Sequence, residues 1–194
     1  MNVEIVCILD RSGSMSSIRS DAIGGFNAFL KDQKAVPGAA KLTLVLFDHE
    51  YIVLHDAVKL EDVPELSSSD FVPRGSTAMF DAIGRTIDAI GGRLDKSDTK
   101  PDKVIVAILT DGEENSSQEY SSDRVAKMIK HQQDKYAWEF VFLAANQDAF
   151  RAGAALNIKA CNTANFVASA VGTADAYSYM SNTTRNMRTA QKTA

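Results

Sequence analysis

Three oxygen-bearing side chains stand at alternate positions in the stretch ILDRSGSMSS: Asp10, Ser12 and Ser14. They follow directly on an apolar run, where an ordinary turn needs only one such residue. Oxygen donors at this density are typical of a site that binds a hard cation. This stretch is therefore the first candidate for chemistry in the chain.

Two further loops carry oxygen donors of the same kind. Asp111 follows an apolar run in AILTDGEEN, and Ser76 and Thr77 precede a helical pattern in PRGSTAMFD. Asp10 and Asp111 are about a hundred residues apart, but adjacent parallel strands bring residues at their carboxyl ends together. The combined set contains no histidine and no thiolate. It therefore favours Mg²⁺, or else Mn²⁺ or Ca²⁺, over zinc.

The strands that must position these loops are visible as apolar runs. Val3–Leu9, Lys103–Thr110 and Trp138–Ala145 are almost continuously apolar, which is typical of parallel strands buried on both faces. Lys41–Asp48 and Tyr51–Val58 are separated only by the dipeptide HE, a link too short for a parallel crossover. We therefore expect a hairpin, with Tyr51–Val58 as an antiparallel edge strand.

Helical patterns lie between these strands. Apolar residues recur at helical spacing over Ser17–Gln33, Ala78–Asp95 and Ser122–Lys135, with a shorter helix in DAFRAGAAL and a last one over Thr173–Lys192. Alternating strands and helices predict a doubly wound α/β fold, Rossmann-like, with about six mainly parallel strands and helices on both faces. We expect one domain over residues 1–194, with a core at about 3–158 and a strand and helix extension at about 159–194.

Composition narrows the class of protein. With 45% hydrophobic residues, 24% charged residues and a net charge of −4, the chain is typical of soluble globular proteins and has no basic footprint for nucleic acid. No apolar run approaches the ~20 residues that span a bilayer, and no signal peptide precedes the first strand. Cys7 and Cys161 are expected to be reduced thiols, so the expected location is cytoplasmic.

The three loops, in this order, resemble those of the von Willebrand factor A domain. Its metal-ion-dependent adhesion site, MIDAS, has the pattern D-x-S-x-S, then T, then D, which DRSGS, GST and TDG match here. The resemblance extends from Val3 to Ile158. The five-residue motif alone is moderately specific, but the threonine and the second aspartate stand in the matching structural places.

The resemblance implies a site and a function. The metal residues would be Asp10, Ser12, Ser14, Thr77 and Asp111, with the hydroxyls in direct contact and the aspartates bound directly or through water. The family uses such a metal for binding other proteins, whose Asp or Glu completes the coordination. The implied function is a metal-dependent protein interaction module, not an enzyme. The helix that starts near Thr77 would also favour an incoming anion through its N-terminus. Nothing indicates the partner's identity or the oligomeric state.

Other interpretations remain open. A haloacid-dehalogenase-like Mg²⁺-dependent phosphatase would use Asp10 as its nucleophile, but it needs an acid two residues later, where Ser12 cannot serve near neutral pH. A calcium EF-hand loop would need Gly and Glu where Met15 and Asp21 stand. The small polar residues could also be ordinary turn residues.

Several charged or polar residues near the loops have two possible interpretations. Arg11 and Arg74 flank the candidate site, where pairing with an acidic partner is one alternative. Glu113, Glu114 and Asn115 are expected to be solvated loop residues, or else part of the rim of a binding surface. Near the other end of the chain, Arg185, Arg188 and Lys192 are expected on a solvated helix end.

Overall fold

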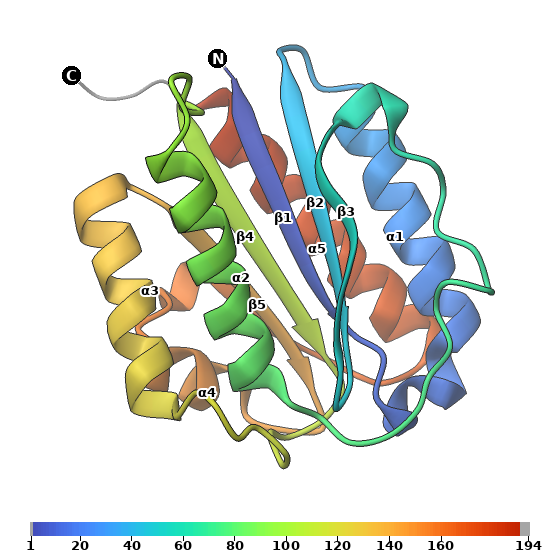
Figure 1. Ribbon diagram of the computed structural model, residues 1–194. Helices are drawn as coiled ribbons and strands as arrows, with labels where there is room; N and C mark the ends of the chain where they lie inside the picture. The colour runs from blue at the N-terminus through green and yellow to red at the C-terminus, as the bar shows by residue number, and fades with distance from the viewer. Residues whose placement is uncertain (1, 191–194) are drawn as a thin grey trace.

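The computed structural model describes residues 2–190 and contains a six-stranded sheet with helices on both faces (Figure 1). The strand order is β3-β2-β1-β4-β5-β6, and only β3 runs antiparallel, against β2. This confirms the predicted fold class and the antiparallel edge. The strands are β1 (Val3–Asp10), β2 (Ala40–Phe47), β3 (Tyr51–Lys59), β4 (Lys103–Thr110), β5 (Glu139–Ala145) and β6 (Thr163–Phe166).

Residues 2–190 contain five α-helices and three short 3₁₀ helices, and all of them except α5 lie between strands. The α-helices are α1 (Arg19–Lys34), α2 (Met79–Asp95), α3 (Ser122–Tyr136), α4 (Ala149–Ala155) and α5 (Ala170–Thr189). The 3₁₀ helices are η1 (Gly13–Ile18), η2 (Leu60–Asp62) and η3 (Ala160–Asn162). Helices α1 and α5 pack on one face of the sheet, while α2, α3 and α4 pack on the other.

The order of strands creates a topological switch point at one edge of the sheet, where the carboxyl ends of β1 and β4 lie side by side. β1 lies between β2 and β4, and the chain passes to opposite faces of the sheet after β1 and after β4. The carboxyl ends of two such strands face a gap between their departing loops, which is where doubly wound proteins bind ligands. In Figure 1 this edge is at the bottom, where the arrowheads of β4 and β5 point.

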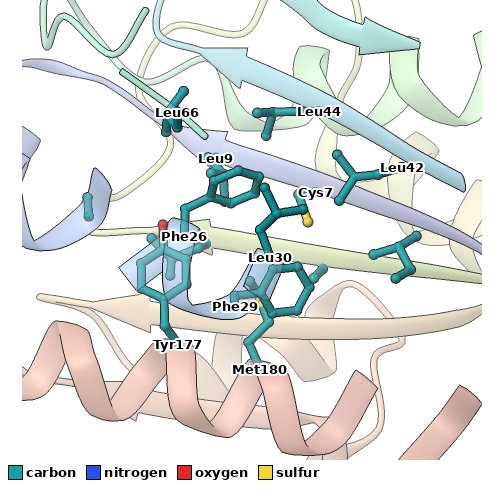
Figure 2. Close-up of a cluster of buried hydrophobic side chains, with 14 of the residues drawn as sticks. Cys7, Leu9, Phe26, Phe29, Leu30, Leu42, Leu44, Leu66, Tyr177 and Met180 are labelled. Atoms are coloured by element: carbon teal, nitrogen blue, oxygen red, sulfur yellow. The ribbon is translucent and has the colours of Figure 1, made fainter. Parts of the chain in front are cut away.

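The core on the α1 and α5 face is built from aromatic and aliphatic side chains (Figure 2). Phe26, Phe29 and Leu30 of α1 are at most 2% exposed. Together with Tyr177 and Met180 of α5 they pack in one cluster with residues of β1 and β2. β1 is buried along its whole length, which explains its continuous apolar sequence.

The segment from about residue 159 supplies the last strand and helix. β6 adds an edge strand parallel to β5, and α5 packs against α1. α5 starts three residues before the expected Thr173, because the Ser169 hydroxyl accepts the Gly172 N–H at 3.2 Å and caps the helix. The expected end of this helix at Lys192 lies outside the described residues. That the whole chain forms a single domain stays a prediction.

Arg188 differs from the expected solvated position. It is only 5% exposed, and its guanidinium donates to Gln33 O at 2.6 Å and to Val36 O at 3.3 Å. These carbonyls belong to the end of α1 and the turn after it, where no further helical N–H is available. Arg188 therefore fastens the C-terminal turn of α5 to the C-terminus of α1. Burial lowers the pKa of this guanidinium.

Two adjacent glycines of α1 test how closely α1 and α5 pack. A Cβ on Gly25 would lie 2.2 Å from a ring carbon of Tyr177, whereas a Cβ on Gly24 would meet nothing within 4 Å. Gly25→Ala is therefore expected to destabilise the fold by about 1–3 kcal/mol through overpacking. Gly24→Ala should stabilise it by roughly 0.5–1 kcal/mol, because alanine favours a helix. Urea denaturation measures both, and equal effects would contradict the close packing.

Two smaller observations complete the description. Cys7 is buried and Cys161 is exposed, and both are free thiols. Within residues 2–190, none of the helices combines the length and the apolar character that crossing a membrane requires.

Candidate metal site

The structure brings all five predicted site residues together at the carboxyl ends of β1 and β4. Asp10 is the last residue of β1, and Asp111 follows the last residue of β4, the adjacent parallel strand. Ser12 directly precedes η1, Ser14 lies in its first turn, and Thr77 lies in the loop before α2. Ser14 is exposed, whereas the two aspartates are at most 1% exposed. The site is therefore buried on the carboxylate side and open to solvent at Ser14.

Asp10 is held by two hydrogen bonds. Its Oδ1 accepts the Ser12 N–H at 2.7 Å, and its Oδ2 accepts the Thr110 hydroxyl at 2.5 Å. Burial, with a smaller contribution from the nearby charge of Asp111, raises the pKa of Asp10 to about 6 despite these bonds. Burial also raises the pKa of Asp111. A cation nearby would offset the cost of keeping both carboxylates ionised.

The hydroxyls and the second aspartate form a continuous chain of contacts. The Ser12 and Ser14 Oγ atoms are 3.0 Å apart, and Ser14 Oγ donates to Asp111 Oδ1 at 2.5 Å. Gly112 leaves room beside them, since a Cβ there would lie 3.5 Å from Ser14 Oγ and 3.4 Å from Thr77 Oγ1. The two hydroxyls thus flank a small space that any side chain at position 112 would fill. We call this space the oxygen cradle.

The backbone of Thr77 is hydrogen-bonded to Asn115, which was expected to be a solvated loop residue or part of the rim of a binding surface. The Thr77 N–H donates to Asn115 Oδ1 at 2.9 Å, and the Asn115 N–H donates back to Thr77 O at 3.0 Å. Ala78 N–H donates to Asp48 O at 2.9 Å on the other side. The backbone around Thr77 is therefore tied to two other loops. In the sequence, the only indication of this role is that Asn115 directly follows the acidic residues Glu113 and Glu114.

The N-terminus of α2 is capped by the loop after β4. Glu114 accepts the Phe80 N–H at 2.9 Å, and the Ser117 hydroxyl accepts the Asp81 N–H at 3.0 Å. Glu114 also accepts the N–H groups of Ser116 and Ser117. This loop thus binds two N–H groups in the first turn of the helix. Glu114 is therefore not merely a solvated loop residue. Its place on the rim of a binding surface and the role of this helix N-terminus toward an incoming anion stay predictions.

The loop that precedes α2 is also tied to the turn after β1. Gly13 N–H donates to Gly75 O at 3.1 Å, and Arg74 N–H donates to Arg11 O at 2.9 Å. Gly75 has φ +64°, and a Cβ there would lie 2.0 Å from His49 Nδ1. Only glycine satisfies both the backbone angle and the space. Gly75 therefore fixes the distance between the two loops.

The carboxylate of Asp48 forms ion pairs with both arginines that flank the site. It is fully buried, and its Oδ2 lies 3.0 Å from both Arg11 Nε and Arg74 Nε. Arg74 also pairs with Glu50. Arg11 is 6% exposed and already paired, so it is not free to bind an acidic partner. These charges hold the loops together behind the oxygen cradle.

The loop between β5 and α4 adds two contacts that the sequence did not suggest. Asn146 Nδ2 donates to Asp111 O at 2.7 Å, and Gln147 Nε2 donates to Gly112 O at 2.8 Å. Both amides bind backbone oxygens of the turn that carries Asp111. They fix the orientation of that turn without adding a charge.

The donor set fits a hard divalent cation. Two carboxylates and three hydroxyls supply oxygen only, which suits Mg²⁺ and Ca²⁺ better than zinc. Across residues 2–190, no three His, Cys, Asp or Glu side chains gather as a group of metal ligands. A site here would therefore depend on its neutral hydroxyls as well as on its two aspartates.

Comparison of the fold with solved structures identifies its class. The PilB minor pilin D319A mutant from Streptococcus sanguinis superposes with a TM-score of 0.68 at 10% identity, over 98% of this chain and 64% of that one. Mussel byssus proximal thread matrix protein 1, in a structure with a zinc-occupied MIDAS motif, gives 0.66 at 13% identity, over 95% and 46%. A von Willebrand factor type A structure from Catenulispora acidiphila gives 0.59 at 14% identity, over 93% and 42%.

The chain has the von Willebrand factor A fold. It spans between 42% and 64% of the length of these three proteins. No protein-family model and no curated protein matches the sequence. The similarity to these structures is in the fold, because sequence identities of 10–14% carry little weight by themselves.

Gly112 offers a direct test of the oxygen cradle in this A fold. Gly112→Ala adds a methyl group at ordinary contact distances, so the fold should remain intact. The same methyl group occupies the space between the Thr77 and Ser14 hydroxyls. We expect Mg²⁺ affinity to fall roughly 10- to 100-fold, as when the surroundings of a metal are disturbed. Calorimetric titration measures this, with Gly24→Ala as the control, and unchanged affinity would place any metal elsewhere.

Proposed function

We propose that this chain is an interaction module that binds a partner protein through a divalent cation, in the cell Mg²⁺. The residues that would hold the ion are Asp10, Ser12, Ser14, Thr77 and Asp111. When bound, the ion would supply an electrophilic centre for an oxygen anion from outside. An Asp or Glu of the partner is the proposed anion.

The proposal is supported by the oxygen atoms that gather around the oxygen cradle. Two carboxylates balance the double charge of the ion, and the other candidate ligands are neutral hydroxyls. Mg²⁺ prefers six oxygens, so five protein residues leave room for at least one more. Exposure of Ser14 provides access to that position from solvent. An oxygen of an outside carboxylate could therefore fill the open coordination position.

Catalysis is the weaker alternative. A phosphatase of the haloacid-dehalogenase type would use Asp10 as its nucleophile and would need a general acid two residues later. Ser12 stands at that position, and a serine hydroxyl cannot serve as the acid near neutral pH. We therefore expect no turnover of phosphomonoesters with Mg²⁺. Steady hydrolysis that disappears in Asp10→Asn would favour the enzyme instead.

Thr77→Ala is the variant that tests metal-dependent recognition. It removes a proposed ligand without changing the charge, and the backbone pairing with Asn115 does not involve the hydroxyl. We expect partner affinity to fall roughly 10- to 100-fold, in line with the loss of metal affinity. The measurement is capture of proteins on the immobilised chain with Mg²⁺ and with EDTA, followed by titration of the retained partner.

Two controls accompany this capture experiment. Gly24→Ala changes an exposed position of α1 and should retain the partner as the unchanged chain does. Alanine replacement of each exposed acid of the partner should identify one whose loss equals the effect of EDTA. Binding that survives EDTA, Thr77→Ala and all acid replacements would assign the interaction to another surface.

A further inference from the structure

Three exposed apolar side chains lie at the edge of the sheet that carries the oxygen cradle. Phe150, Val167 and Val171 are 48%, 71% and 72% exposed. Phe150 is in the first turn of α4, which follows β5, and Val171 is in the first turn of α5, which follows β6. Both helices therefore begin beside the carboxyl ends of these strands. Exposed apolar side chains that gather on one surface indicate a site of interaction.

Contacts of the neighbouring backbone bring these three residues together. Asn165 Oδ1 accepts the Ala149 N–H at 2.8 Å, which joins the end of β6 to the start of α4. A Cβ on Gly172 would lie 2.1 Å from Val167 O, so the first turn of α5 packs closely on the residue after β6. Each of the three apolar residues is within two positions of a residue in these contacts. We call the three residues the apolar ledge.

The register of the strands gives the distance between the oxygen cradle and the apolar ledge. The pairing of β4 with β5 and of β5 with β6 places Asp111 level with Phe166, two strands away. Val167 of the apolar ledge is the next residue. Adjacent strands are about 4.8 Å apart, so the two sites are separated by about 10 Å.

The loop between β5 and α4 makes the two sites continuous. Asn146 donates to Asp111 O at 2.7 Å, and Gln147 donates to Gly112 O at 2.8 Å. The same loop leads into α4, and Phe150 is the third residue after Gln147. A protein bound at the cation would therefore meet the apolar ledge beside it.

The charges next to the apolar ledge do not favour a charged group there. Asp148 and Arg151 are exposed and have opposite signs. The Asp148 carboxylate also accepts the Arg151 N–H at 3.1 Å, as the cap of α4. Since water leaves an apolar surface most favourably when another apolar surface covers it, the ledge favours an apolar side chain.

We propose that the partner of the metal site presents an acidic residue together with a large apolar side chain about 10 Å away from it. The carboxylate would complete the coordination of the cation, and the apolar side chain would cover the apolar ledge. An extended segment advances about 3.3 Å per residue, so the two side chains would be about three residues apart. This inference rests on the proposed function, because it assigns a second contact to the partner of the metal.

Three synthetic peptides test this joint recognition. The Phe peptide is acetyl-Phe-Gly-Gly-Asp-Gly-Gly-Phe-amide, which places a phenyl ring three residues from the aspartate in both directions. The Ser peptide has serine in place of both phenylalanines, and the Asn peptide has asparagine in place of the aspartate. Titration of each into the ¹⁵N-labelled chain, followed by NMR in excess MgCl₂ and in EDTA, measures the affinity.

We expect the Phe peptide to bind in MgCl₂ with a Kd on the order of 1 mM, as for other ligands of this size. The Ser peptide should bind about tenfold more weakly, because it cannot cover the apolar ledge. The Asn peptide should not bind, and EDTA should abolish binding of the other two. Both effects are expected because the carboxylate would reach the chain only through the cation.

Matched variants assign the effect of the phenyl ring to the apolar ledge. Phe150→Ser should weaken the Phe peptide about tenfold and leave the Ser peptide unchanged. Val167→Ser should act in the same direction. Tyr136 is 50% exposed and ends α3, at the opposite end of the sheet, so Tyr136→Ser should leave both peptides unchanged.

Failure of this inference and failure of the proposed function give different results. Equal Mg²⁺-dependent affinities of the Phe and Ser peptides would overturn the role of the apolar ledge and leave the metal function standing. A Phe peptide that binds equally in EDTA, or no better than the Asn peptide, would overturn the joint recognition. Absence of Mg²⁺-dependent binding by all three peptides would contradict the proposed function as well. The comparison of peptides uses the unchanged chain, so it remains decisive even if a variant folds poorly.

Discussion

Magnesium at 100 times its dissociation constant is expected to raise the free energy of unfolding by about 2.7 kcal/mol. The reason is that the ion would bind only the folded chain, where loops from residues 10, 77 and 111 meet. Burial raises the pKa of both Asp10 and Asp111, so a cation bound beside them would favour their ionised forms. Urea denaturation with MgCl₂ and with EDTA measures the difference.

Matched variants make the magnesium effect specific. Asp111→Ala removes a proposed ligand and should abolish the metal-dependent gain. Glu113→Ala removes an exposed carboxylate two residues away and should leave the gain unchanged. Manganese should act like magnesium on an all-oxygen site. Equal stabilisation of the unchanged chain and Asp111→Ala would show that the cation binds elsewhere.

Asp48→Ala is expected to lower the free energy of unfolding by about 3–5 kcal/mol, independently of metal. Asp48 is fully buried, and its Oδ2 lies 3.0 Å from the guanidinium of Arg11, which is only 6% exposed. Removing the carboxylate leaves a buried cation without its partner, which costs more than the pair itself contributes. Urea denaturation in EDTA isolates this effect from any metal binding.

Two comparisons test the origin of the Asp48 effect. Glu50→Ala breaks a contact with Arg74 in the same cluster, but Glu50 is half exposed, so the loss should be at most about 1 kcal/mol. Adding Arg11→Met to Asp48→Ala removes the unpaired cation and should restore part of the lost stability. A loss that the second substitution leaves untouched would mean that the carboxylate acts through its other contacts.

The strands could be predicted from local sequence. With them, it could be predicted that the loops after β1 and β4 lie close together. Residues of β1 and β4 are buried on both faces, and this leaves continuous apolar runs that end in Asp10 and near Asp111. The hairpin of β2 and β3 followed from the short link between them, which is three residues long in the structure. Both inferences depend on residues close together in the chain, where periodicity and link length are informative.

The supporting contacts were not predictable, because they join distant residues through side chains without a periodic pattern. Asn115 pairs with Thr77 across 38 positions, and Asn146 reaches the carbonyl of Asp111 across 35. Arg188 looked like a solvated cation, but it is buried against residues about 150 positions earlier. A polar residue in a loop has the same local signature whether it faces water or another loop.

The central place of β1 in the sheet has a consequence for synthesis of the chain. Val3 pairs with Lys103, so β1 cannot pair with β4 until the chain has been synthesised a hundred residues further. At about 5–20 residues per second, that delay on the ribosome is on the order of 5–20 seconds. Until then one side of an apolar eight-residue strand has no neighbour, and open strand edges template aggregation. The strand that carries Asp10 is thus also a segment through which nascent chains can pair with one another.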